Sequence, residues 1–209
     1  MRTTIVLARH GRTAWHHGNR YTGSTDLPID EVGVQQAQQL KDWAAAYAPV
    51  ALWCSPMLRA RQTAAPLAEA LDLQPTLDAR LREVDFGSAE GKMLSELPPA
   101  VSKAFQLDPV RDHFPGGEDP VEAADRVHEV FQEIGQRHEG QKVLVVAHNT
   151  LIRLLVCRVL GLRLNDYRRL LPALGPAALV RFRWQDGTVG LEAYNVPLVI
   201  PPARMETQA

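Results

Sequence analysis

The sequence predicts an α/β fold: a three-layer α/β/α sandwich with a mostly parallel central sheet, helices on both faces, and a small cap or insert. Short apolar runs alternate along the chain with longer segments of helical periodicity, which is typical of parallel sheets covered by crossover helices. The last apolar segment folds back at an Asp-Gly pair, which indicates an antiparallel hairpin. The chain of 209 residues is predicted to form a single domain, 1–209.

The first strand is predicted over residues 4–8, an uninterrupted apolar run. The segment 30–48 then predicts a helix, because Asp30 can serve as its N-cap and apolar residues follow at helical spacing. The apolar positions that define this helical face are Val34, Ala37, Leu40, Trp43 and Ala44.

A second apolar run, 50–55, predicts another short strand. The residues after it, 56–71, predict a helix with Pro56 near its first turn. Farther along, the charged segment 116–140 predicts a helix that is entered from a Gly-Gly turn.

Residues 142–148 predict a third buried strand, and the mostly apolar segment 150–162 predicts the helix that follows it. Residues 178–196 alternate in the manner of strands around Asp186 and Gly187, which predicts the closing hairpin.

Two segments depart from this alternation. Residues from about 85 to 120 are rich in Gly and Pro and less regular, so we expect an inserted cap or a set of long loops. The last residues, about 201–209, predict a flexible C-terminal tail.

Composition narrows the class of protein and its partners. The net charge of −1 argues against a general nucleic-acid-binding protein, which usually has a basic face. Two cysteines are too few for a disulfide scaffold, which predicts a cytoplasmic location. The chain shows neither a signal-peptide pattern nor an apolar run long enough for a membrane. The oligomeric state is left open, with a homodimer as one alternative.

Charged and titratable residues follow three of the predicted strands. Arg9 and His10 end the first, Arg59 comes after the second, and His148 and Asn149 follow the third. Ligands of open parallel sheets bind beyond the carboxyl ends of the strands. We therefore expect these side chains in one crevice, where helix N-termini add N–H donors for an anion.

These residue types suit phosphoryl chemistry. Two arginines bind oxygens in pairs and indicate a dianion such as a phosphoryl group. A histidine among them can act as the nucleophile, because nearby cations disfavour its protonated form. A second histidine can donate to the phosphoryl oxygens. The segment RLREVDFGSAEG offers Glu83, Asp85 and Glu90 as an acid for the leaving oxygen.

Five motifs occur in order over residues 5–155: LARHGRTAW, SPMLRARQTA, LREVDFGSAEG, FPGGED and VVAHNTLIRLL. Together they resemble the histidine phosphatase superfamily, also called the phosphoglycerate-mutase-like family, and its phosphatase branch. The resemblance implies that His10 forms a phosphohistidine, which water hydrolyses. It implies that Arg9, Arg59 and His148 complete the phosphate pocket. Glu83 matches the proton donor, with Asp85 second, whereas Glu90 matches a position that we expect to be structural.

Other positions match or break the family pattern near the substrate. His16 stands where the family often has an Asn that touches phosphate, so an imidazole contact replaces it or the contact is lost. Asn149 stands where Gly is common in the family. Arg20, Thr22 and Gly23 belong to a loop that is expected to lie over the substrate. The predicted substrate-binding residues are His16, Arg20, Thr22, Gly23 and Asn149.

The resemblance and the residues predict a metal-independent phosphatase that hydrolyses phosphomonoesters of small metabolites and needs no cofactor. A phosphoglycerate-mutase-type phosphotransferase with the same phosphohistidine is the first alternative, and a non-catalytic module that binds phosphate esters is the second. We expect the substrate among sugar phosphates, phosphoglycerate derivatives and ribazole-type phosphates. We expect the cap to decide the substrate, with Arg82, Arg111 and His113 as the predicted contacts.

Overall fold

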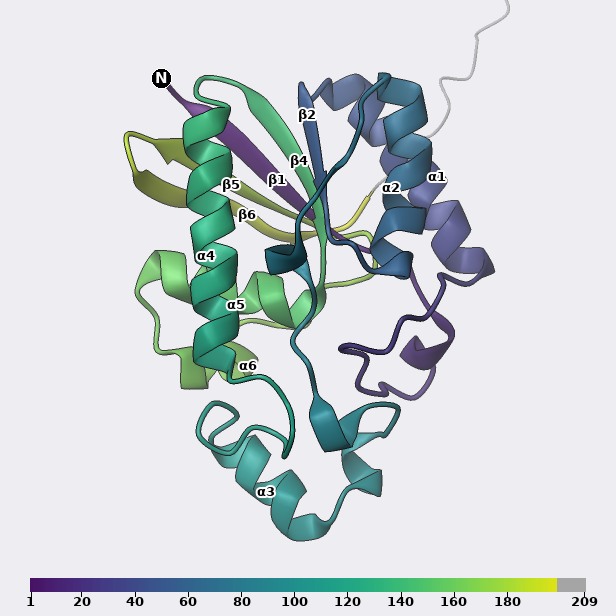
Figure 1. Cartoon of the computed structure of the whole chain (residues 1–209), viewed down its shortest axis with the longest axis vertical. Coiled ribbons are helices and arrows are strands. Elements are labelled where there is room, and N and C mark those ends of the chain that lie inside the picture. Colours follow the sequence, from purple (N-terminus) through teal and green to yellow (C-terminus); the bar gives the residue numbers. More distant parts are fainter. Residues whose placement is uncertain (199–209) are drawn as a thin grey trace, which may run out of the picture.

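In the computed structural model, which describes residues 1–198, one central sheet has the strand order β3-β2-β4-β1-β5-β6 (Figure 1). The strands are β1 (Thr3–Arg9), β2 (Ala51–Cys54), β3 (Thr76–Leu77), β4 (Lys142–Ala147), β5 (Leu179–Gln185) and β6 (Thr188–Val196). β1 to β4 run parallel, whereas β5 is antiparallel to β1, and β6 to β5. The mostly parallel sheet and its closing hairpin are confirmed.

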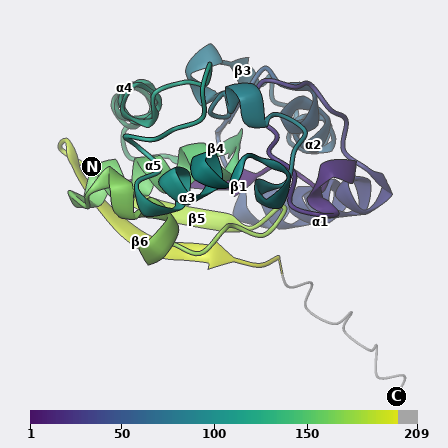
Figure 2. The same ribbon diagram turned by 90° about the horizontal axis from the view of Figure 1, so that it is seen from below.

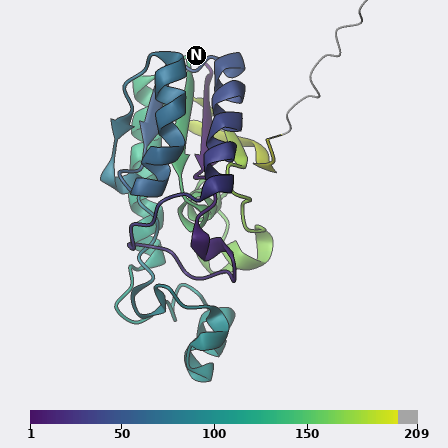
Figure 3. The same cartoon turned by 90° about the vertical axis from the view of Figure 1, so that its right-hand side faces the viewer.

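Helices cover both faces of the sheet, as predicted (Figures 1 and 3). The α-helices are α1 (Glu31–Tyr47), α2 (Leu58–Leu71), α3 (Pro99–Leu107), α4 (Pro120–Arg137), α5 (Asn149–Leu160) and α6 (Tyr167–Leu170). Short 3-10 helices are η1 (Ala14–His16), η2 (Ala79–Leu81), η3 (Gly87–Ala89), η4 (Leu94–Glu96) and η5 (Leu164–Asp166). Alternate strand residues point to opposite faces. In β1, Val6 packs with α1 and α2, while Ile5 and Leu7 pack with α4 and α5.

In the first turn of α1, the buried residue is not the one that the sequence predicts. Asp30 is the N-cap, and its carboxylate accepts the N–H of Gly33 at 2.9 Å. Val34, however, is half exposed at 50%. Gly33 is buried instead. It packs so closely against the loop after β1 that a Cβ there would lie 2.3 Å from the Arg12 carbonyl oxygen. The first turn of α1 is thus pressed against the chain that leaves β1.

Two short secondary-structure elements were not predicted from the sequence, and the start of a third was misplaced. β3 has two exposed residues, and α6 has four residues, so neither carries a periodic apolar pattern. Pro56 precedes α2 rather than lying within it, since Met57 is the N-cap. The tail predicted over 201–209 lies outside the described residues.

The residues from about 85 to 120, here the cap segment, extend away from the sheet beyond the carboxyl ends of its parallel strands (Figures 1 and 3). They contain α3 and two single-turn helices. Phe105 stacks on Phe114 with ring centroids 4.0 Å apart, and Tyr21 packs edge-on against Phe114 at 4.8 Å. An aromatic cluster therefore joins the cap segment to the loop after β1. Within residues 1–198, no helix has the length and apolarity that crossing a bilayer would require.

Candidate active site

The carboxyl ends of β1, β2 and β4 meet at the end of the sheet that faces the cap segment (Figure 1). Seen from below, α3 of the cap segment lies in front of this end (Figure 2). β4 lies between the other two strands and pairs with both in parallel. The N–H of His10 continues this pairing and donates to the Ala147 carbonyl at 3.0 Å. The first residues beyond the three strands, His10, Ser55 and His148, are therefore neighbours.

His10 is held as a neutral imidazole with a defined tautomer. Its side chain is buried, and Nδ1 lies 2.7 Å from the Gly11 carbonyl oxygen, which can only accept. The ring proton is therefore on Nδ1, and Nε2 keeps its lone pair. Burial lowers the pKa of His10 well below its usual value, and the neighbouring His148 and Arg9 lower it further.

His148 lies beside His10, with ring centroids 5.1 Å apart. It is completely buried, and its Nε2 forms a 2.8 Å hydrogen bond with the Ser55 hydroxyl. Burial and the positive charge of Arg59 hold the pKa of His148 well below its usual value. Its Nδ1 is buried without a hydrogen-bond partner in the described part of the chain. A buried polar atom of this kind is available to a ligand.

Arg9 and His16 bring two donors to one point. Arg9 Nη1 donates to the Leu174 carbonyl, and Nη2 lies 2.6 Å from His16 Nε2. The Thr13 N–H donates to His16 Nδ1 at 3.0 Å, which places the imidazole proton on Nε2. Burial and Arg9 lower the pKa of His16 to about 4, so the ring is neutral. Two N–H donors held this close repel each other, so the pair suits one shared acceptor, such as an anionic oxygen.

Arg59 and Glu90 hold the loop 22–25 from two sides. The buried Arg59 guanidinium donates to the carbonyls of Gly23 (2.8 Å) and Thr25 (2.9 Å). Glu90 accepts the N–H of Gly23 at 2.8 Å and the hydroxyl of Thr25 at 2.7 Å. A Cβ on Gly23 would lie 2.3 Å from Glu90 Oε1. Glu90 is therefore structural, as predicted, and the N–H and carbonyl of Gly23 are both used within the protein.

Glu83 reaches the first turn of α5. Its carboxylate accepts the N–H groups of Thr150 (3.0 Å) and Leu151 (2.9 Å), and also its neighbour Val84 (3.0 Å). The side chain is nearly buried. A helix N-terminus carries partial positive charge, which attracts the carboxylate. The Glu83 carboxyl group is therefore fixed at the N-terminus of α5, directly after His148.

These side chains open onto a cavity of about 1000 Å³. The predicted residues that line it are Arg9, His10, His16, Arg20, Thr22, Glu83 and Asn149. The predicted residues Arg59, His148 and Gly23 are buried behind this lining. Within residues 1–198, no three His, Cys, Asp or Glu side chains gather as a metal site.

Two of the predicted substrate-binding residues are already engaged. Arg20 donates to both carboxylate oxygens of Glu96, at 2.7 and 3.1 Å, and to the Gly91 carbonyl at 2.8 Å. Asn149 accepts the Leu174 N–H at 2.8 Å through its side-chain oxygen. In this structure both side chains hold the cavity wall together while facing into it.

The end of the cavity away from His10, here its mouth, is lined by cationic side chains that were not predicted from the sequence. They are Lys103 on α3, Arg153 on α5 and Arg168 on α6. No sequence signal placed Lys103 and Arg168, because α3 and α6 were not predicted. Arg153 lies on the predicted helix after β4, within the motif VVAHNTLIRLL, but it was not singled out. The further residues predicted as substrate contacts, Arg82, Arg111 and His113, do not line the cavity. Arg111, for example, pairs with its neighbour Asp112 at 2.8 Å.

The family model of the histidine phosphatase superfamily (branch 1) matches residues 5–197. The chain belongs to this superfamily. A probable phosphoglycerate mutase GpmB of Salmonella paratyphi C is 32% identical over 169 residues, 79% of each chain. Phosphoserine phosphatase 1 of Hydrogenobacter thermophilus is 30% identical over 166 residues, 78% of this chain and 79% of that one.

Solved structures of the superfamily share the fold. A mycobacterial glucosyl-3-phosphoglycerate phosphatase aligns with a TM-score of 0.84 at 25% identity, over 94% of this chain and 100% of that chain. The predicted enzyme class, a phosphoric monoester hydrolase, agrees with this superfamily and with the phosphatases among the relatives.

Proposed function

We propose that the protein is a phosphatase that hydrolyses phosphomonoesters of small metabolites through a phosphohistidine on His10, without a metal ion. One observation carries the proposal. His10 is a buried neutral imidazole whose Nδ1–H is fixed by the Gly11 carbonyl, so the Nε2 lone pair is free for attack beside the positive charge of Arg9.

The first half-reaction forms a nitrogen–phosphorus bond and breaks the ester bond. His10 Nε2 attacks the phosphorus atom, and the ester oxygen leaves with the bonding electrons and a proton from the Glu83 carboxyl group. The Nδ1–H of the phosphorylated ring carries positive charge, which the Gly11 carbonyl stabilises at 2.7 Å. Glu83 ends this step as a carboxylate, and the alcohol departs.

The second half-reaction reverses these roles. Glu83 takes a proton from the attacking water, an oxygen–phosphorus bond forms, and the nitrogen–phosphorus electrons return to His10 Nε2. The carboxyl group regains its proton, so no net proton leaves Glu83 in a complete cycle. Its three N–H contacts hold one position through both steps.

The charge that stabilises the transferring phosphoryl group comes from the chain itself. Arg9 and His16 present donors at one point, and Arg59 adds positive charge behind His10. The unpaired Nδ1 of His148 is a further donor if the Ser55 hydroxyl donates to Nε2. These groups supply what a metal ion would otherwise supply in phosphoryl transfer.

The cavity favours a substrate with a second negative group. Glu83 is the one acidic residue among the described residues that line it. Lys103 and Arg168 are exposed at its far end and form no ion pair within residues 1–198. Arg168 also lies over the Phe105 ring at 4.9 Å, which places its guanidinium against α3. One relative is named a phosphoserine phosphatase. Phosphoserine is a substrate of this kind, because it carries a carboxylate in addition to its phosphate.

A mutase is the second candidate, because one relative at 32% identity is named a probable phosphoglycerate mutase. Phosphate release from p-nitrophenyl phosphate in excess EDTA, with acid-labile phosphate trapped on the protein, tests the phosphatase. Activity that requires a bisphosphorylated primer would support the mutase instead. Phosphate-ester binding without turnover would overturn both.

A further inference from the structure

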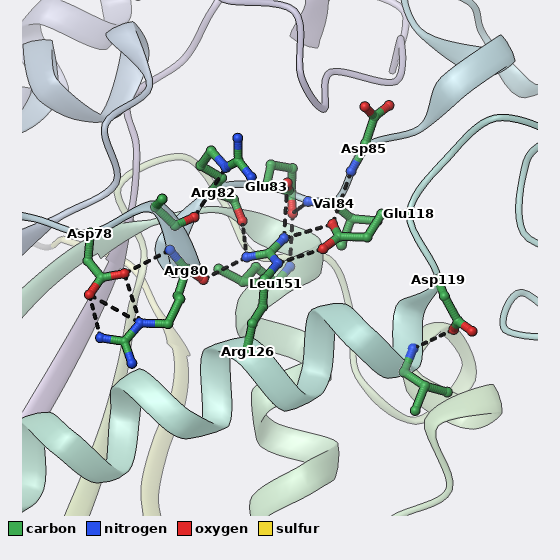
Figure 4. A network of polar contacts seen from close by, with 12 residues as sticks. Asp78, Arg80, Arg82, Glu83, Val84, Asp85, Glu118, Asp119, Arg126 and Leu151 are labelled. Carbon is green, nitrogen blue, oxygen red and sulfur yellow. Dashed lines mark hydrogen bonds and ion pairs between the residues drawn. The ribbon is translucent and has the colours of Figure 1, made fainter.

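Arg126, on α4, contacts the segment of chain that presents Glu83 to the cavity (Figure 4). Its Nη1 donates to the carbonyls of Arg80 (2.6 Å) and Arg82 (2.9 Å), and its Nη2 reaches the carbonyl of Glu83 itself (3.3 Å). The Arg126 side chain therefore donates hydrogen bonds to three backbone carbonyls within a segment of four residues. Within residues 1–198 this segment pairs with no strand: it overlaps the single turn of η2 and follows the two-residue β3.

Glu118 completes the arrangement from the other side of the guanidinium. It accepts Arg126 Nε at 2.6 Å and Nη2 at 2.8 Å, so the pair is bidentate. Its backbone N–H donates to the Asp85 carbonyl at 2.9 Å. Arg126 and Glu118 together fasten the chain on both sides of Glu83, with side chains only 17% and 20% exposed.

The two ends of Glu83 are thus held by different helices. The carboxylate is fixed by the N-terminus of α5, while the backbone is fixed from α4 through Arg126. Arg126 does not line the cavity, and its guanidinium is paired with Glu118. Its effect on the reaction would therefore act through the placement of Glu83 rather than through contact with substrate.

We propose that Arg126, locked by Glu118, is the positioning residue that aims the Glu83 carboxyl group at the leaving oxygen. This rests on the proposed role of Glu83 as the acid. A displacement of about 1 Å in a catalytic group can cost about 100-fold in rate. Loss of three backbone contacts frees the Glu83 segment for a shift of that size.

The test compares two leaving groups by kcat/KM, which reports the transfer to His10 as the first irreversible step. Glycerol 3-phosphate has a poor leaving group that needs the acid, and p-nitrophenyl phosphate has an activated one that does not. Arg126→Met should lower kcat/KM by about 10-fold to 100-fold for glycerol 3-phosphate and less than about threefold for p-nitrophenyl phosphate. In the Glu83→Gln background, Arg126→Met should add almost nothing, because the aimed group is already gone.

Arg80→Met is the matched control. Arg80 also joins η2 to α4, through ion pairs with Glu129 (3.0 Å) and Glu133 (2.6 Å), but its side chain does not contact the carbonyl of Glu83. Its loss should leave the ratio of the two rates unchanged. Glu118→Gln serves if Arg126→Met does not fold, and should shift the ratio in the same direction by a smaller factor.

Equal slowing of both substrates by Arg126→Met, or full additivity with Glu83→Gln, would overturn the positioning role and leave the proposed phosphatase standing. If Glu83→Gln itself slows both substrates equally, the acid role of Glu83 fails, and the inference about Arg126 fails with it.

Discussion

The two ends of the cavity are built in different ways. At the floor, His10 and His148 follow adjacent strands and are almost wholly buried. At the mouth, Lys103 and Arg168 are exposed and come from short helices far apart in sequence. The sheet therefore sets the geometry of the floor, whereas the side chains of the mouth depend on how the cap segment packs. We expect chemistry to reside at the floor and substrate choice at the mouth.

The largest effect should come from the floor. His10→Ala removes the nucleophile, so turnover of p-nitrophenyl phosphate should fall by about 1000-fold or more, and acid-labile phosphate on the protein should disappear. His17→Ala is the matched control, because His17 is exposed and does not line the cavity. Near-normal activity in His10→Ala would contradict the phosphohistidine mechanism.

Glu83→Gln should have the next largest effect, and it should depend on the leaving group. The amide keeps one oxygen for the α5 N–H groups but cannot donate the proton, so kcat/KM for glycerol 3-phosphate should fall by about 100-fold or more. The loss for p-nitrophenyl phosphate should be much smaller. Equal losses would move the acid role to another carboxyl group, with Asp85 next in line.

Lys103→Met and Arg168→Met test the mouth. Each should lower kcat/KM for 3-phosphoglycerate by about 10-fold, since one attraction to its carboxylate is lost in a partly enclosed site. Glycerol 3-phosphate, which lacks that carboxylate, should change little. Arg169→Met is the control, because Arg169 pairs with Asp166 at 2.9 Å and does not line the cavity. If both substrates lose equally, these cations do not select a second negative group.

The same contrast explains what the sequence could and could not predict. Strand ends are marked by apolar runs, so the sequence alone places Arg9, His10 and His148 at one edge of the sheet. The roles given to them stay predictions. Lys103 and Arg168 carry no such mark, because one lies on a cap helix and the other on a four-residue helix. Their approach depends on long-range packing, such as Arg168 over Phe105, which no local pattern encodes.

The buried histidines of the floor should also appear in the pH dependence of stability. The pKa of His10 and the pKa of His148 are lowered in the folded protein, mainly by burial. The unfolded chain therefore binds protons that the folded one does not, and the free energy of unfolding should fall as pH falls below 6.5. Each such histidine contributes about 1 kcal/mol between roughly pH 7.5 and 5.5.

Urea unfolding at the two pH values measures this contribution. In His10→Gln, the loss of stability between the two values should be smaller by about 1 kcal/mol, because one proton-linked group is gone. An unchanged difference would mean that the pKa of His10 is about the same in the folded and the unfolded protein.

The smallest effect should come from His16→Asn, at the boundary between floor and mouth. An Asn at this position offers an oxygen that can accept the Thr13 N–H, as His16 Nδ1 does at 3.0 Å, and an amide N–H in place of Nε2–H. His16→Asn should therefore change kcat/KM for p-nitrophenyl phosphate by less than about threefold, whereas His16→Leu, which lacks both groups, should lower it by about 10-fold or more. Inhibition by inorganic phosphate should weaken in parallel only in His16→Leu. If the two variants behave alike, His16 is a spacer, and Arg9 alone binds the anion at this point.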